Sequence, residues 1–243
     1  MPIRINKFEK GRPVHIISKA VAERRIFADE DDCLRFIFQA YAANTGKPAH
    51  NLRRVDINKT ARAILNGEDI PSKFITKEHL PLVHFLDFSL IINHYHLFLV
   101  PNIENAIPIY MKKTNGNFAL YFNLKYNNKG VVFNGPYKAV IIKTQFQLDA
   151  VSRYVSVINP LDVFQPGWRK GGLKNPREAF KFLKSFQFSS FPDKIGERKS
   201  KILAPPEILE KYLTLGFDIK TYKEFVKDFL REKSDTSRSL FLE

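Results

Sequence analysis

One apolar stretch near the middle of the chain constrains the fold more than any other feature. Between Leu82 and Val100 the apolar content is high and β-branched residues recur. This composition favours strands over helices. Asp87 and Asn93 interrupt the run, so we expect two adjacent strands with a tight connection or a bulge between these two residues. Strands joined by a tight connection pair antiparallel.

The second of these strands carries a His-x-His motif, His94 and His96, inside the segment LIINHYHLFLV. Alternate residues of a strand face the same side, so both imidazoles point the same way. Two imidazoles on one face can hold a divalent cation, with a third protein ligand and waters completing the shell. Two ordinary histidines are the alternative, but burying both without partners in an apolar strand is costly. The motif therefore favours a metal site.

The rest of the sequence alternates strand and helix patterns. Residues 30–44 carry apolar side chains at helical spacing after an acidic start, which the helix dipole favours. A helix over residues 106–126 is expected to be interrupted or capped near Asn115 and Gly116. Pro160 is expected to end a helix over residues 145–158, because the residue before proline avoids helical dihedrals. The expected strands cover residues 14–21 and 130–143, the latter around a turn at Asn134-Gly135-Pro136.

These elements predict an α+β domain over residues 1–165, with a central antiparallel β-sheet of ferredoxin-like type and helices on its face. Residues 47–79 are polar and are expected to form an insertion, with a short helix from Lys59 to Asn66. A breaker-rich connection then opens a basic C-terminal extension over residues 166–243. Three helices are expected within the extension, over residues 178–186, 206–213 and 221–233.

The charge balance favours a polyanionic partner. Lys and Arg outnumber Asp and Glu by 39 to 25, which gives a net charge of +14. Such an excess is typical of nucleic-acid-binding proteins, although basic proteins without such a ligand are equally common. Cys33 is the single cysteine, so no disulfide can form within the chain, as expected in a reducing cytoplasm. The sequence has no uncharged apolar run of about 18 residues, and a soluble cytoplasmic protein is expected.

Tyr154 borders the apolar face of the helix over residues 145–158. A half-buried structural tyrosine is the ordinary interpretation of such a position. A tyrosine phenolate can also attack a DNA phosphodiester, with a metal polarising the non-bridging oxygens. Asn159 follows closely and offers an amide oxygen as a third metal ligand.

Several stretches together resemble a known family. In chain order they are PVHIISKAVAERRIF, NHYHLFLV, YFNLKY, NGPYKAVII, SRYVSVINP and FSSFPDKIG. The sequence resembles the single-tyrosine transposases of the HUH superfamily (the IS200-like transposase family), and within them the REP-associated tyrosine transposases. The likeness covers most of residues 13–200, with residues 47–79 outside it.

The resemblance implies a ferredoxin-like HUH domain that nicks and rejoins single-stranded or hairpin DNA. Tyr154 would be the nucleophile, leaving a 5′-phosphotyrosine and a free 3′-OH. His94, His96 and Asn159 would hold Mg²⁺ or Mn²⁺. In the family the tyrosine and the third ligand typically stand one helical turn apart, whereas five positions separate Tyr154 from Asn159. A wide or π-type turn before Pro160 would restore the geometry.

Basic residues in or beside the expected catalytic elements are candidates for DNA phosphate contacts. The aromatic stripe of residues 118–126 could stack on bases, but a stripe at helical spacing more often belongs to a core. The chain is expected to be a monomer or a homodimer. The expected nucleic-acid-binding residues are Arg24, Arg25, Lys112, Lys113, Lys125, Lys138 and Lys143.

Two other functions stay open at the level of sequence. One is a catalytically inactive, domesticated protein that binds hairpin DNA or RNA, which the altered spacing of Tyr154 and Asn159 favours. The other is a metal-dependent hydrolase unrelated to DNA, in which a carboxylate such as Asp87 or Glu104 joins the two histidines. The basic charge balance and the lack of a longer metal motif disfavour the hydrolase.

Overall fold

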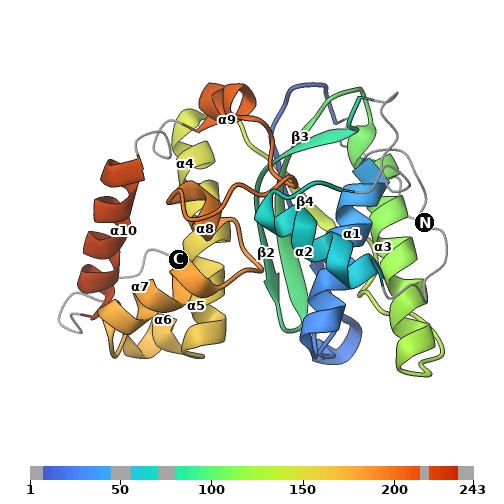
Figure 1. The fold of residues 1–243 in the computed structure, drawn as a ribbon, viewed down its shortest axis with the longest axis horizontal. Coiled ribbons are helices and arrows are strands. Elements are labelled where there is room, and N and C mark those ends of the chain that lie inside the picture. The colour runs from blue at the N-terminus through green and yellow to red at the C-terminus, as the bar shows by residue number, and fades with distance from the viewer. Residues whose placement is uncertain (1–7, 45–55, 71–79, 214–218, 235–243) are drawn as a thin grey trace.

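A four-stranded antiparallel sheet forms the centre of the computed structural model, which describes residues 8–44, 56–70, 80–213 and 219–234. The strand order β2-β3-β1-β4 and the chain order of strands and helices are those of a ferredoxin-like fold. The expected α+β class with a central antiparallel sheet is confirmed (Figure 1). The strands are β1 (Val14–Lys19), β2 (Val83–Ile91), β3 (His94–Pro101) and β4 (Lys138–Ile141).

The central apolar stretch of the sequence folds as the β2–β3 hairpin. Its two strands pair antiparallel from Val83↔Pro101 to Ile91↔His94, with a bulge between Phe85 and Asp87. Both strands are buried almost throughout, because helices cover both faces of the sheet. Alternate residues of β3 therefore enter two different apolar clusters.

The first face of the sheet is covered by α1 (Glu30–Asn44) and α3 (Ala106–Lys125), with α2 (Asp56–Asn66) packed on α1. The expected interruption of α3 near Asn115 and Gly116 is wrong, since the helix is continuous. A glycine inside a helix costs only about 1 kcal/mol, and the buried side chains of Tyr110 and Phe118 on the same helix outweigh it. Asn115 also donates a hydrogen bond to Ser18 of β1.

The second face is covered by a long composite helix. It runs through α4 (Gln145–Arg153), the π-helical turn η3 (Tyr154–Ile158) and α5 (Asn159–Phe164). The expectation that Pro160 ends this helix is wrong. Proline normally clashes with the carbonyl four residues earlier, and the wide turn that precedes Pro160 relieves this clash. Asn159 therefore keeps helical dihedrals, φ −66° and ψ −44°.

Two other segments are shorter than expected or only partly described. Within residues 130–143 the described strand covers Lys138–Ile141 alone, while Phe133 makes an isolated bridge to Ala20. The helix expected from Lys59 to Asn66 is present as α2 and starts at Asp56. The other parts of the expected insertion include residues 47–55 and 71–79, which lie outside the described residues.

The C-terminal part is helical, as expected, and packs against α4 and α5 (Figure 1). Val157 and Leu161 share an apolar cluster with Trp168, Leu183 and Leu230. Packing therefore crosses the predicted boundary between residues 165 and 166. No helix in the described ranges is long and apolar enough to cross a bilayer. The C-terminal helices are α6 (Trp168–Gly171), α7 (Pro176–Ser185), α8 (Phe191–Lys194), α9 (Pro206–Tyr212) and α10 (Ile219–Ser234).

A buried ion pair joins the sheet to the C-terminal helices. Lys194 Nζ of α8 lies 3.0 Å from Asp87 Oδ2 of β2, with the side chains 7% and 0% exposed. Ser190 donates to the other carboxylate oxygen at 2.6 Å, and Lys194 donates to Ser152 of α4. Burial has the largest single effect and lowers the pKa of Lys194, but the charge and hydrogen bond of Asp87, together with Tyr222 and Asp149, outweigh it, so the pKa is raised. The network thus links β2, α4 and α8.

Removing one member of this pair is expected to destabilise the fold strongly. Lys194→Met leaves Asp87 as a buried charge, so we expect the free energy of unfolding to fall by about 3–5 kcal/mol. Urea unfolding followed by circular dichroism measures the change. Lys181→Met is the matched control, because Lys181 pairs with Glu178 at the surface, where the side chains are 73% and 51% exposed. Equal losses in the two variants would contradict the argument from burial.

Candidate functional site

His94 and His96 lie on the same side of β3, and their ring centroids are 5.0 Å apart. The Nδ1 atom of His94 is 2.6 Å from Asn93 Oδ1. An amide oxygen only accepts hydrogen bonds, so His94 carries its proton on Nδ1 and a lone pair on Nε2. The Nδ1 atom of His96 is 3.0 Å from His15 Nε2. His94 and His96 therefore both use Nδ1 for a contact within the protein, which leaves Nε2 of each free for a ligand.

His15 is part of the site, although it was not among the site residues predicted from the sequence. It lies on β1, is buried, and stacks on His96 with the ring centroids 5.2 Å apart. The register explains the contact, because Ile17 stands opposite His96 and His15 faces the same side two residues earlier. A histidine that ligates a metal usually has its second nitrogen fixed by such a partner.

Burial keeps all three imidazoles uncharged. It lowers the pKa of His15 and of His94 to about 4. It lowers the pKa of His96 to about 2, and the positive charge that His15 and His94 carry when protonated adds to the effect. Neutral imidazole is the form that binds a metal ion. The site is therefore ready to bind a cation at neutral pH without first releasing protons.

Tyr154 stands beside the histidines at the first position of η3. Its ring centroid is 5.5 Å from that of His96 and 5.9 Å from that of His15, in edge-on arrangements. The side chain is half-buried. The structure thus brings a tyrosine from the long composite helix next to histidines from two strands, while the roles expected for Tyr154, His94 and His96 stay a prediction.

The π-type turn expected from the Tyr154–Asn159 spacing is present. The backbone N–H of Asn159 donates to the carbonyl of Tyr154, five positions earlier, which places the two residues one wide turn apart. The Asn159 side chain is buried, and its Oδ1 accepts a long hydrogen bond of 3.4 Å from Arg169 Nη2. Its Nδ2 has no hydrogen-bond partner within the described part of the chain.

Arg169 of α6 is a second residue that the sequence did not single out. Its guanidinium carbon lies 5.4 Å from the Tyr154 ring centroid. Asp162 holds it through two hydrogen bonds, Nη2 to Oδ2 at 2.6 Å and Nε to Oδ1 at 3.0 Å. These bonds raise the pKa of Arg169, so a fixed positive charge faces both Tyr154 and Asn159.

The donor atoms available for a metal are two imidazole nitrogens and the amide oxygen of Asn159. Across the described ranges, no group of three or more His, Cys, Asp or Glu side chains is arranged to hold a metal ion. Imidazole nitrogens suit Zn²⁺, Fe²⁺, Ni²⁺ and Cu²⁺, whereas an amide oxygen and waters suit Mg²⁺ and Mn²⁺. The carboxylates considered for a hydrolase are engaged elsewhere, since Asp87 pairs with Lys194 and Glu104 accepts from the backbone of Lys10.

The cations expected to contact DNA lie on several elements, among them α3 and β4. Lys125 lies on α3 and pairs with Asp29 and Asp32 at 2.7 and 2.8 Å. Arg24 donates to Asn128 at 2.6 Å. Their role in DNA binding stays a prediction. The exposed members of the set are Arg25, Lys112, Lys113, Lys125, Lys138 and Lys143.

The aromatic stripe of α3 belongs mainly to the core, as its helical spacing favoured. Phe118 and Phe122 are buried in the main apolar cluster. Tyr121 and Tyr126 both donate hydrogen bonds to the buried Asp32, at 3.0 and 2.7 Å. The stripe thus ties α3 to the start of α1.

Comparison with known proteins gives a likeness at the level of structure only. No family model matches the chain, and no curated protein matches it. A solved structure of a REP-associated tyrosine transposase bound to a REP hairpin is similar, with a TM-score of 0.45 and 12% sequence identity. The match covers 84% of this chain and 92% of that chain.

The contact between His15 and His96 predicts a loss of metal affinity when it is removed. His15→Phe keeps a ring but offers no partner to Nδ1 of His96, so we expect Mn²⁺ affinity to fall about 10- to 100-fold. Isothermal titration calorimetry measures it. His15→Gln is the control, because its amide oxygen still accepts a hydrogen bond. Unchanged Mn²⁺ binding by His15→Phe would show that His15 does not support a metal site.

Proposed function

We propose that the protein is a metal-dependent single-strand DNA endonuclease and strand transferase, a transposase-type enzyme that forms a 5′-phosphotyrosine intermediate. One observation carries the proposal. The ring of Tyr154 lies against that of His96, and the guanidinium of Arg169 contacts both the Tyr154 ring and the side-chain oxygen of Asn159. The candidate nucleophile, the two histidines and the amide oxygen come from separate segments of the chain and lie close together. Strand transfer by a tyrosine requires such a grouping.

The residues fit a divalent cation, Mn²⁺ or Mg²⁺. The Nε2 atoms of His94 and His96 are not used by the hydrogen bonds that orient the rings, and Asn159 supplies the third donor, an amide oxygen. A cation bound there polarises the non-bridging oxygens of the scissile phosphate. Asn159 would then exchange its long hydrogen bond to Arg169 for the metal.

The chain's own residues account for the bond changes. The Tyr154 phenol loses its proton and its oxygen bonds to phosphorus, while the bond from phosphorus to the 3′-oxygen breaks. The departing oxygen takes up a proton from water, which balances the proton that the phenol releases to water, and becomes a free 3′-OH. A 3′-OH can later attack the phosphotyrosine and release Tyr154, so rejoining needs no outside energy source. Arg169 stands where it can balance the charge on the phenolate and on the phosphate.

The substrate we propose is single-stranded or hairpin DNA. The net charge of +14 supplies the long-range attraction for a polyanion. The hydrogen-bonding and charged groups around Tyr154 suit a phosphodiester better than a neutral substrate, because Arg169 forms two-point contacts with acidic oxygens. Its present partner, Asp162, is one such acid.

The nucleophile is tested with labelled hairpin oligonucleotides and Mn²⁺ on a denaturing gel. We expect a metal-dependent, detergent-resistant protein–DNA band that Tyr154→Phe and His94→Ala abolish. Tyr41→Phe and His84→Gln are the matched controls, because Tyr41 and His84 line another pocket, between α1 and β2, and their variants should retain the band. Removal of the metal with EDTA should also abolish it. A band that survives Tyr154→Phe would assign the nucleophile elsewhere.

A second function, hairpin binding without cleavage, has one observation in its favour. The oxygen of Asn159 already accepts a hydrogen bond from Arg169, which competes with metal binding. If the protein binds hairpins without cleaving them, the same gel shows no covalent band with any metal, and the protein still binds the hairpin in EDTA.

Arg169 gives a further prediction for the cleavage reaction. Arg169→Met removes the charge that faces Tyr154, and loss of one such stabilising group lowers the rate about 10²- to 10³-fold. Single-turnover formation of the covalent band measures the rate. Lys170→Met is the control, since it removes an adjacent but exposed charge. Equal rates for the two variants would exclude a role for Arg169 in the chemical step.

A further inference from the structure

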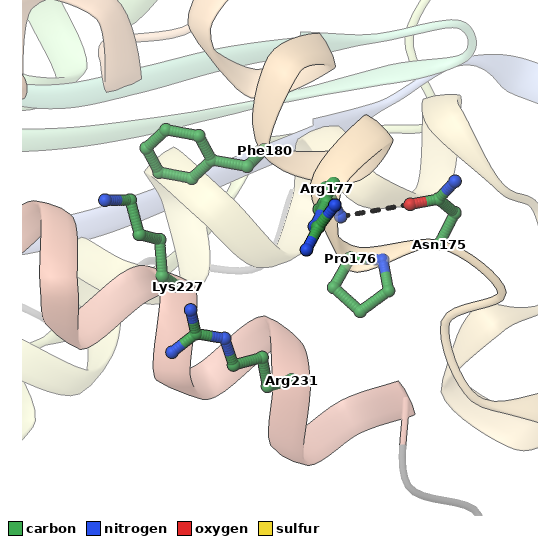
Figure 2. Close-up of a pocket in the computed structure, with 6 residues that line it drawn as sticks. All are labelled: Asn175, Pro176, Arg177, Phe180, Lys227 and Arg231. Carbon is green, nitrogen blue, oxygen red and sulfur yellow. Dashed lines mark hydrogen bonds between the residues drawn. The ribbon is translucent and has the colours of Figure 1, made fainter.

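A cavity of about 490 Å³ lies between the start of α7 and the later turns of α10. Figure 2 shows Arg177 reaching into this space from α7, opposite Lys227 and Arg231 of α10. Among the described residues that line the cavity, none is acidic. The lining residues are Asn175, Pro176, Arg177, Phe180, Lys227 and Arg231.

The cations of α10 are available for an anion. Lys227 and Arg231 stand one helical turn apart on the same face. Each is paired within α10, Lys227 with Glu224 and Arg231 with Asp228, both at 2.8 Å. The side chains of Lys227 and Arg231 are 38% and 69% exposed, and ion pairs this exposed to water contribute little and exchange readily. A phosphate between the helices can therefore replace the carboxylates.

The start of α7 adds to the positive potential but does not make the site by itself. Asn175 Oδ1 already accepts from the backbone N–H groups of Arg177 and Glu178, both at 3.1 Å. The helix dipole still favours an anion at this end, while the direct contacts come from side chains. Phe180 supplies an apolar wall, with Lys227 Nζ 5.7 Å from its ring centroid. A charged group joined to an apolar one, such as a phosphate on a sugar, matches this lining.

The cavity is close to the candidate catalytic cluster along the chain. Asn175 follows Arg169 by six positions, which limits their separation to about 21 Å even for an extended chain. Duplex DNA covers that distance in about six base pairs. A single DNA molecule with its cleavage point at Tyr154 can therefore reach the cavity.

The geometry points to a second DNA contact at this cavity, where Arg177, Lys227 and Arg231 hold a backbone phosphate of the DNA that Tyr154 cleaves. This inference rests on the proposed function for the identity of the nucleic acid. The contact lies within the C-terminal extension and involves no base edge. It therefore contributes affinity and orientation rather than sequence preference.

The test compares hairpin binding by two triple variants in EDTA over a series of salt concentrations, using fluorescence anisotropy. One variant is Arg177→Gln/Lys227→Gln/Arg231→Gln. The matched control, Lys59→Gln/Lys199→Gln/Lys211→Gln, removes the same charge from exposed positions outside the cavity. We expect the slope of log affinity against log salt to become shallower by about one unit for each DNA phosphate that the variant no longer neutralises. The control should keep the wild-type slope.

Further measurements separate this inference from the proposed function. Covalent-band formation on a short single strand that contains only the cleavage site should be unchanged in the cavity variant. Equal slopes in the two triple variants would overturn the DNA contact, whether or not cleavage occurs. If the wild type binds no DNA, the proposed function fails and the DNA contact fails with it. Calorimetry then shows whether the cavity is an anion site for free phosphate only. In that event inorganic phosphate binds the wild type and not the cavity variant.

Discussion

The arrangement of the candidate site depends on the buried ion pair between Asp87 and Lys194. Two charges removed from water stabilise a fold only when each stays with its partner, so the pair fixes α8 against β2. Because Lys194 also donates to Ser152, two positions before Tyr154, the same contact holds the tyrosine helix to the sheet. The C-terminal helices are thereby kept where Arg169 reaches the tyrosine ring. Residues beyond position 165 are structural parts of the site.

Local patterns in the sequence were enough to predict most of the sheet and its first face. The helix over residues 30–44 and the strand pair that carries His94 and His96 depend on periodicity and on an acidic helix start, both of which are properties of short segments. The wide turn between Tyr154 and Asn159 was also expected, because the family resemblance calls for the two residues to stand one turn apart and the spacing is one residue too long for an ordinary turn. The prediction of an α+β fold needed no more than the order of these elements.

The failures have a different physical origin. His15 belongs to the site only through the register of β1 against β3, and Arg169 only through the path of the chain after α5, and neither is a local property. Gly116 and Pro160 do tend to interrupt a helix, as the sequence analysis assumed, but other interactions outweigh this tendency in the structure. Buried side chains on both sides of Gly116 hold α3 together, and the wide turn makes room for the proline ring. Long-range packing or the wide turn therefore decided each case in which the sequence prediction was incomplete or wrong.

The π-helical turn also determines how the rest of the chain is oriented. One extra residue in an ordinary α-helix rotates every later side chain by about 100° around the axis. A single wide turn absorbs the extra residue where it occurs, so the helical phase downstream is preserved. Leu161 thus still faces the apolar cluster of the C-terminal helices. The distance in sequence between the tyrosine and the asparagine can therefore change by one residue while each keeps its neighbours.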